Sequence, residues 1–287
     1  SVLTSTTSSA SFEAWGWRVA FLLSAVLLVI GLWIRLSVDE SPIFKAALAK
    51  ARARKAEERA HRLPFVDVMR LHWRDVLVAM GARMAENISY YIITAFVLVY
   101  CVDHLQLPKQ TALNAVLIGS AIQFLLIPVF GALSDRIGRR PVYLLGAVGT
   151  GGWIWAFFAL ADTRSAVWLT VAVTVGLIFH SAMYAPQAAF FAELFATRMR
   201  YSGASIGAQL SSVAAGAPAP LIAVALLGSF HGSWTISLYV GVAALITVIA
   251  VLAGRETRGR DLSDIAPGKG APQPVTGVRK GAIRPSA

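Results

Sequence analysis

The chain has 287 residues, of which 56% are hydrophobic and only 14% charged, a composition that excludes an ordinary soluble domain and favours a membrane protein. A net charge of +11 would suggest a nucleic-acid partner for a soluble chain, but in a membrane protein basic residues collect on one side of the bilayer, so no nucleic acid is predicted. Cys101 is the only cysteine, which excludes an internal disulfide and a cysteine-based metal site, and no metal site is predicted.

Seven apolar runs follow one another, each long enough to cross a hydrocarbon core of about 30 Å as a helix. Trp15 and Trp17 precede the first run, where an interfacial aromatic belt is expected. In the sixth run small residues, including Gly207, recur every four positions and favour close helix packing, while Pro218 and Pro220 should bend the helix. The predicted spans are residues 19–34, 76–102, 113–133, 142–161, 167–191, 203–227 and 234–253.

Polar segments divide the chain and set its predicted orientation. If residue 1 lies outside and the C-terminus is cytoplasmic, 21 of the 26 Lys and Arg fall on the inner side and three on the outer side. We therefore expect a multi-pass protein of the cell membrane, surrounded by the lipid bilayer. The predicted parts are an outer loop and first span (1–37), a cytoplasmic linker with an amphipathic helix (38–75), a six-helix bundle (76–254) and a disordered basic tail (255–287).

A short charged turn, residues 131–141, separates the third and fourth spans and is called the signature turn below. Gly131 is expected to let two backbones approach closely. Gly138 is expected to adopt the positive φ that reverses the chain, and Pro141 is expected at the first position of the next helix.

The charges of the signature turn indicate contacts at the membrane surface. Asp135 is placed to accept from the N–H groups of a neighbouring helix start. Arg136, Arg139 and Arg140 can bridge to acidic groups or to phosphates of lipid headgroups. A turn that obeys the positive-inside rule and has no further role is the alternative interpretation.

The pattern Gly-x-x-x-Asp-Arg-x-Gly-Arg-Arg-Pro resembles the signature loop of the major facilitator superfamily of secondary transporters. Together with Arg83-x-x-Glu86-Asn87 and the segment 193–203, it resembles the metabolite:proton symporter branch of that superfamily. Ala196 departs from the branch, which usually has proline there. The resemblance implies gating by the signature turn and a proton gradient as the energy source, with no cofactor.

The resemblance also implies a twelve-helix fold in two halves. The chain is then an all-α membrane protein whose seven transmembrane helices are equivalent to helices 6–12, with residues 38–75 as the linker between the halves. Because alternating access needs both halves, we expect the chain to act with a missing N-terminal half and to be inactive alone. Asp135 would then lack its usual partner helix.

Polar residues on one face of the second span form the first candidate site. Arg83, Glu86, Asn87, Tyr90 and Tyr91 follow helical spacing, and ionisable groups at this depth usually face a cavity or a partner. We expect Arg83 to bind a substrate carboxylate and Glu86 to carry the proton, with Asn87 and the two tyrosines orienting the substrate. A purely structural Arg–Glu pair is the alternative.

A second polar face lies on the fifth span. His180, Tyr184 and Gln187 follow helical spacing, and His180 either shuttles protons or simply hydrogen-bonds across helices. Two glutamines of other spans, Gln123 and Gln209, are further candidates for the cavity wall. Near the inner surface, a salt-bridge cluster is expected from Glu193, Arg198 and Arg200.

These features predict a proton-coupled symporter for a small organic solute, and Arg83 favours a carboxylate or compatible solute. A seven-helix receptor is the alternative, although its retinal form fails because no lysine lies within a span. A membrane-embedded enzyme is a further alternative, disfavoured because no catalytic constellation is visible. No enzyme activity is predicted.

Overall fold

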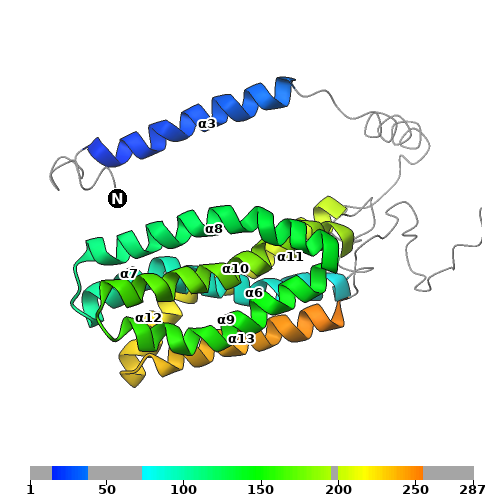
Figure 1. The fold of residues 1–287 in the computed structure, drawn as a ribbon. Coiled ribbons are helices and arrows are strands. Elements are labelled where there is room, and N and C mark those ends of the chain that lie inside the picture. The colour runs from blue at the N-terminus through cyan, green and yellow to red at the C-terminus, as the bar shows by residue number, and fades with distance from the viewer. Residues whose placement is uncertain (1–14, 38–72, 195–199, 255–287) are drawn as a thin grey trace, which may run out of the picture.

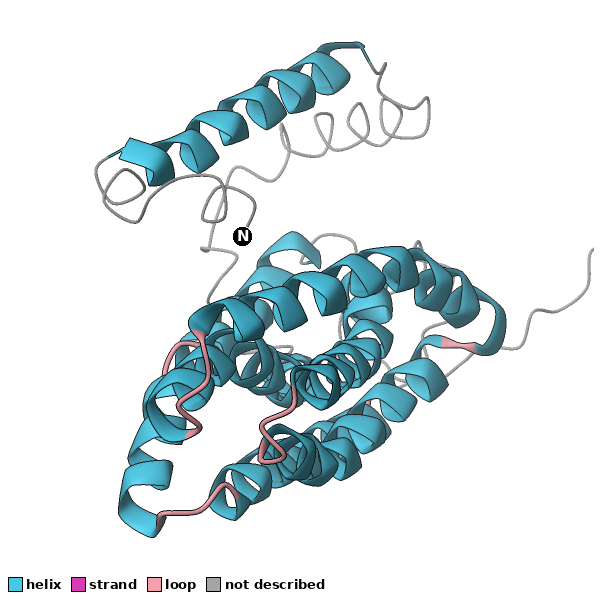
Figure 2. Ribbon diagram, turned by 60° about the vertical axis from the view of Figure 1, so that its left-hand side comes forward, coloured by secondary structure: helices cyan, strands magenta, loops and turns pink. Residues whose placement is uncertain are grey.

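The computed structural model describes residues 15–37, 73–194 and 200–254, and the structural statements below concern these residues alone (Figure 1). The predicted linker helix and basic tail, and Arg198 of the expected salt-bridge cluster, lie outside them. Within the described part of the chain the regular structure is entirely helical (Figure 2). Seven helices there are long and apolar enough to cross a membrane, which agrees with the seven predicted spans.

The first span is α3 (Trp17–Ser37), which stands apart from the other helices in Figure 1. Its apolar side chains, among them Phe21, Leu28 and Trp33, are exposed along its length. Such a surface is stable in hydrocarbon or against another apolar surface, but not in water.

The second span is continuous from Trp73 to His104 but contains two π-helical segments. It consists of α6 (Trp73–Tyr91), the π-helical segment η2 (Ile92–Phe96), α7 (Val97–Val99) and the π-helical segment η3 (Tyr100–His104). A π-helical turn inserts one extra residue and turns the helix face that follows it, and such turns are frequent at functional sites. The first one begins directly after Tyr91.

The third to fifth spans are single helices. They are α8 (Lys109–Ile137), α9 (Arg139–Ala161) and α10 (Ala166–Leu194). Helix α10 is the central element of the bundle and packs mainly against α8 and α9, with further contacts to α6 and α11. This position brings polar groups of α10 within hydrogen-bonding distance of side chains on α6, α8 and α9.

The sixth span is interrupted, as its prolines predict. It consists of α11 (Arg200–Ser211), the π-helical segment η4 (Ser212–Gly216) and α12 (Ala219–Phe230). Because Pro218 has no N–H to donate, regular α-helical bonding cannot continue through it. The close packing expected from the small residues is confirmed at Gly207, where an added Cβ would lie 2.8 Å from the Cβ of Ala79 on α6.

The seventh span, α13 (Trp234–Ala253), has the predicted bounds and packs against α9 and α6. Thr247 joins it to α6, because its hydroxyl donates to the carbonyl oxygen of Gly81 (2.8 Å) and accepts from the N–H of Ala85 (2.9 Å). Hydrogen bonds of this kind fix the rotation of α6 about its axis, and that rotation decides which side chains α6 turns toward α10.

Candidate functional site

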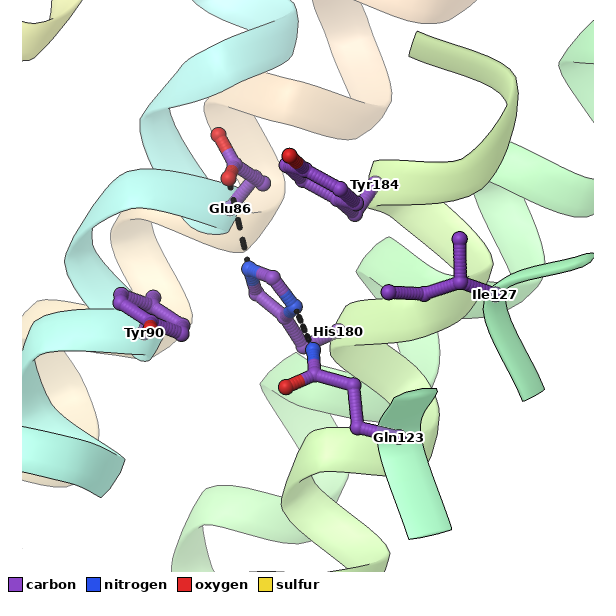
Figure 3. Close-up of a pocket in the computed structure, with 6 residues that line it drawn as sticks. All are labelled: Glu86, Tyr90, Gln123, Ile127, His180 and Tyr184. Carbon is purple, nitrogen blue, oxygen red and sulfur yellow. Dashed lines mark hydrogen bonds and ion pairs between the residues drawn. The ribbon is translucent and has the colours of Figure 1, made fainter. Parts of the chain in front are cut away.

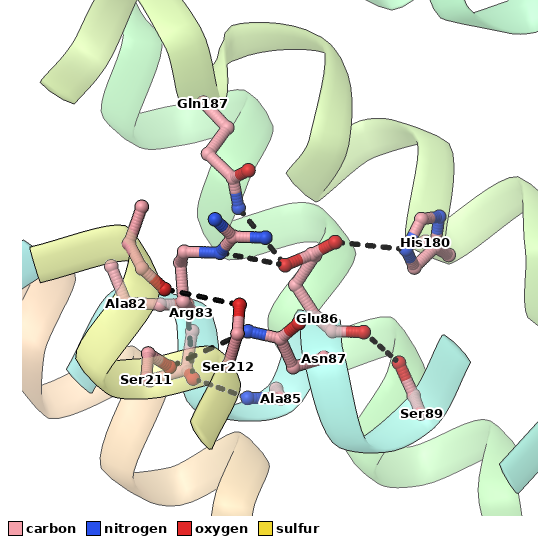
Figure 4. A network of polar contacts seen from close by, with 12 residues as sticks. Ala82, Arg83, Ala85, Glu86, Asn87, Ser89, His180, Gln187, Ser211 and Ser212 are labelled. Carbon is pink, nitrogen blue, oxygen red and sulfur yellow. Dashed lines mark hydrogen bonds and ion pairs between the residues drawn. The ribbon is translucent and has the colours of Figure 1, made fainter. Parts of the chain in front are cut away.

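Glu86 is the centre of a polar network within the bundle (Figure 4). Glu86 is only 4% exposed, and its carboxylate has three partners. Oε2 accepts from Nε of Arg83 at 3.3 Å and from Nε2 of Gln187 at 3.1 Å, while Oε1 lies 3.3 Å from Nε2 of His180. A lone charge in hydrocarbon is costly, so these partners on α6 and α10 account for its presence there.

His180 extends this network to α8 (Figure 3). Its Nδ1 lies 2.6 Å from Nε2 of Gln123, and both residues are buried. The ring of His180 also has two aromatic neighbours, Tyr90 with centroids 5.1 Å apart and Tyr184 with centroids 5.7 Å apart. The cross-helix hydrogen bonding expected for His180 is therefore present, and it joins three spans.

A cavity of about 220 Å³ opens beside this network. The side chains around it come from α6, α8 and α10, and Glu86 is the one carboxylate among them (Figure 3). The lining residues are Glu86, Tyr90, Gln123, Ile127, His180 and Tyr184. A space bordered by an acid, an imidazole, an amide and two phenol rings can accommodate and orient a small polar molecule.

The network lies halfway along the helices. Gln123 is the central residue of the 29-residue α8, and His180 is the central residue of the 29-residue α10. Glu86 lies about 20 Å along the helix axis from Trp73, at a rise of about 1.5 Å per residue in a span of 32 residues. The site is thus near the middle of the bundle rather than at either end.

The remaining candidates of the second span point in different directions. Glu86 turns toward α10, whereas Asn87 turns toward α11 and donates from Nδ2 to Oγ of Ser211 at 3.4 Å. Tyr91 is exposed and its ring contacts that of Tyr90, with centroids 5.9 Å apart. The Arg83–Glu86 pair exists, as the structural alternative requires, but Glu86 also borders the cavity.

One predicted residue is not part of the site, and one residue that the sequence did not predict contacts it. Gln209 is exposed on α11 and is not among the residues that line the cavity. Tyr143, on α9, was not expected from the sequence, although its hydroxyl donates to the carbonyl oxygen of Ala82 (3.0 Å) and accepts from Nε2 of Gln187 (3.2 Å). No spacing pattern indicates Tyr143, because its partners lie on two other helices.

The signature turn reverses the chain between α8 and α9 at Gly138, whose φ of 109° confirms the predicted positive φ. Two expectations were wrong. A Cβ added at Gly131 would meet no described atom within 4 Å, so the expected close approach of two backbones is not present among the described residues. Helix α9 begins at Arg139, so Pro141 is in the first turn but is not its first residue.

Arginines of the signature turn join helix ends at one end of the bundle. Arg139 donates from Nη1 to Oγ of Ser134 (2.8 Å) and to the carboxylate of Asp135, and its Nη2 is 3.4 Å from Oε1 of Glu193. Asp135 therefore pairs with an arginine four residues later, within the turn. Arg136 is exposed.

Arg140 fixes the end of α13. Its Nε and Nη2 donate to the carbonyl oxygens of Val251 (3.0 Å) and Leu252 (2.7 Å), which lack partners within the helix. The expected cluster around Glu193 thus includes Arg139. Of its two predicted arginines, Arg198 is outside the described residues and Arg200 begins α11, where only the backbone is described.

A bundle of apolar helices with a polar cavity halfway along their length is typical of a membrane transport protein. The family described as "Sugar (and other) transporter" matches residues 1–268, so the chain belongs to this family of the major facilitator superfamily. An all-α membrane fold and the predicted family are therefore confirmed. Membership of a transporter family also distinguishes the chain from enzymes.

Curated relatives are transporters as well. The chain is 33% identical over 261 residues to the shikimate transporter of Escherichia coli (strain K12), covering 90% of this chain and 58% of the relative. It is 31% identical over 259 residues to an inner membrane metabolite transport protein of the same strain, covering 88% and 56%. It is 29% identical over 269 residues to the proline/betaine transporter of Salmonella typhimurium (strain LT2), covering 90% and 52%. The chain thus spans somewhat more than half the length of these relatives.

Proposed function

We propose that the chain is the C-terminal portion of a proton-coupled symporter that carries a small organic solute by alternating access. The observation that carries this proposal is the Glu86–His180–Gln123 network beside a cavity in the middle of the bundle. An ionisable side chain kept at this depth marks a proton or substrate pathway more often than a structural support. The polar groups face a space in which a solute can lie.

In this proposal Glu86 carries the proton. It is the one carboxylate among the cavity-lining residues, and both of its oxygens are held by donors from α6 and α10. Protonation would neutralise the carboxylate and release Arg83 from its charge partner. Proton binding and substrate binding would then be coupled through one arginine.

The substrate in this proposal is a carboxylate or a compatible solute. Arg83 would bind the carboxylate once Glu86 is protonated, because guanidinium groups pair well with carboxylates. Tyr90 and Tyr184, which line the cavity, would orient the rest of the solute, with Asn87 and Tyr91 at its edge. Transport of shikimate, proline or glycine betaine is consistent with the names of the relatives, and these solutes are the first to test.

The proposal also assigns each part of the chain to a place in the carrier and in the cell. The seven spans would correspond to helices 6–12 of a twelve-helix carrier in the plasma membrane, with residues 38–75 as the linker and residues 255–287 in the cytoplasm. Residues 76–254 would form the C-terminal half and residues 1–37 the end of the N-terminal half. Rocking of one half against the other needs both halves, so the chain alone should not transport.

The test is uptake of labelled solute by cells that produce the chain together with the N-terminal helices of such a carrier. An inward proton gradient should drive accumulation, Glu86→Gln should abolish the effect of the gradient, and the chain alone should show no uptake. Asp103→Asn is the control, since it removes an exposed acid at one end of the same span, away from the cavity beside Glu86. Unchanged proton-driven uptake in Glu86→Gln would contradict the role of Glu86.

A further inference from the structure

The orientation of the Gln123 amide decides which nitrogen of His180 carries the hydrogen. In the orientation present here, Nε2 of Gln123 lies 2.6 Å from Nδ1 of His180, and an amide nitrogen can only donate, so Nδ1 accepts and has no hydrogen. Nε2 lies 3.3 Å from Oε1 of Glu86, and a carboxylate can only accept, so Nε2 carries the hydrogen and donates. Figure 3 shows the three side chains in one row, with the imidazole between the amide and the carboxylate.

This arrangement opposes a second proton on His180. A proton added to Nδ1 would place two donors face to face at the 2.6 Å contact, unless the Gln123 amide turned to present its oxygen. Glu86 can accept a proton without such a rearrangement on α8. The other titratable or charged groups around the His180–Glu86 pair come from α6, α9 and α10, and are Arg83, Tyr90, Tyr143 and Tyr184.

We propose that Gln123 is a positioning residue that keeps His180 neutral with its hydrogen on Nε2 and thereby directs the carried proton to Glu86. In the proton step, a hydronium ion in the cavity gives its proton to a carboxylate oxygen of Glu86 and leaves as water, while the imidazole keeps its single hydrogen. Gln123 itself neither gains nor loses a proton. This inference rests on the proposed proton coupling and adds a reason why an amide occupies the centre of α8.

The first test is nitrogen-15 NMR of the chain in membrane-mimetic particles, with labelled histidine. The chain has five histidines, so the His180 signals are identified as those absent from His180→Asn. The expected wild-type spectrum near neutral pH shows a hydrogen on Nε2 and none on Nδ1. A hydrogen on Nδ1 in the wild-type chain would overturn the inference without any need for a folded variant at position 123.

The second test replaces the donor by an acceptor. In Gln123→Glu, a carboxylate can accept from Nδ1, so His180 should become doubly protonated at the same pH and its Nδ1 signal should shift to the protonated position. Gln110→Glu is the matched control on the same helix, where the glutamine is exposed and bonds to Asn114 at 2.8 Å. An unchanged His180 spectrum in a folded Gln123→Glu chain would contradict the proposal.

A transport assay distinguishes a failure of this inference from a failure of the proposed function. With both halves present, Gln123→Glu should lose the effect of the proton gradient because His180 retains the proton, whereas Gln110→Glu should keep it. The NMR spectra do not depend on transport. Wild-type uptake that does not depend on the proton gradient would therefore refute the proposed coupling. The spectra would still decide whether Gln123 determines which nitrogen of His180 carries the hydrogen.

Discussion

Arg139 at the start of α9 and Glu193 near the end of α10 form an ion pair, with Nη2 and Oε1 3.4 Å apart across 54 residues of sequence. The two side chains are mostly buried, at 14% and 18% exposed. Because Arg139 also contacts Asp135, one guanidinium connects the ends of three helices. The inner end of the bundle, as predicted from the charge distribution, is thus held by charge as well as by apolar packing.

This ion pair should show energetic coupling in a double-mutant cycle. We expect Arg139→Gln to destabilise the chain more than Glu193→Gln, because it also removes the contacts with Asp135 and Ser134. The coupling energy between the two substitutions should be about 0.5–3 kcal/mol, as for other residues in direct contact. Unfolding by SDS in mixed micelles measures it. Strictly additive effects of the two substitutions would show that the ion pair contributes nothing to the free energy of unfolding.

The contact between α11 and α6 should not tolerate a side chain at Gly207. Its Cβ would lie 2.8 Å from Ala79, and the carbonyl oxygen of Val76 would be 3.6 Å away. Gly207→Val should therefore lower the free energy of unfolding by about 1–3 kcal/mol through overpacking. Gly241→Val on α13 is the control, since nothing lies within 4 Å of its added Cβ. Equal melting temperatures for both variants would contradict the observed packing.

The hydroxyl of Tyr143 should contribute to the position of Gln187 and so to the environment of Glu86. Tyr143→Phe removes the donor to Ala82 and the acceptor for Gln187, at an expected cost of about 0.6 kcal/mol in the membrane. Tyr239→Phe is the control, because it removes a tyrosine hydroxyl on α13 that does not contact Gln187 or Ala82. The measurement is SDS unfolding together with the KM of uptake in the complete carrier. A KM that rises only in Tyr143→Phe is expected.

Arg83 should matter for its shape as well as for its charge. Arg83→Lys keeps the positive charge but loses the fork geometry that binds a carboxylate through two N–H groups. We expect a rise in KM of about tenfold, equivalent to about 1.4 kcal/mol, with a smaller change in kcat. Arg164→Lys, in the exposed loop between α9 and α10, is the control. An unchanged KM in Arg83→Lys would exclude bidentate binding of a carboxylate by Arg83.

Features that depend on local chemistry could be predicted from the sequence. Hydrophobic length predicted seven spans, and the bounds of α13 agree with the prediction because a tryptophan and a glycine flank its uncharged run. The positive φ of Gly138 follows from a glycine at a chain reversal. The proximity of Arg83 to Glu86 follows from their spacing of three on one helix.

Features that depend on how helices rotate against one another could not be predicted. Tyr143 meets Gln187 only because α9 and α10 pack with those faces together, and no residue near Tyr143 indicates this. Gly131 was expected to allow a close contact because of its residue type alone, but no described atom would lie within 4 Å of a Cβ added there. The π-helical segment after Tyr91 also has no composition that distinguishes it from a regular helical turn.

The central placement of His180 has a consequence for access from the two sides. Because it is the middle residue of α10, the imidazole lies about 21 Å from either end of that helix. In the proposed carrier, an ion or solute would therefore travel the same depth to His180 from either face of the membrane. Such a carrier would not need to move the imidazole itself, because opening a path from either face would connect the same fixed position to water.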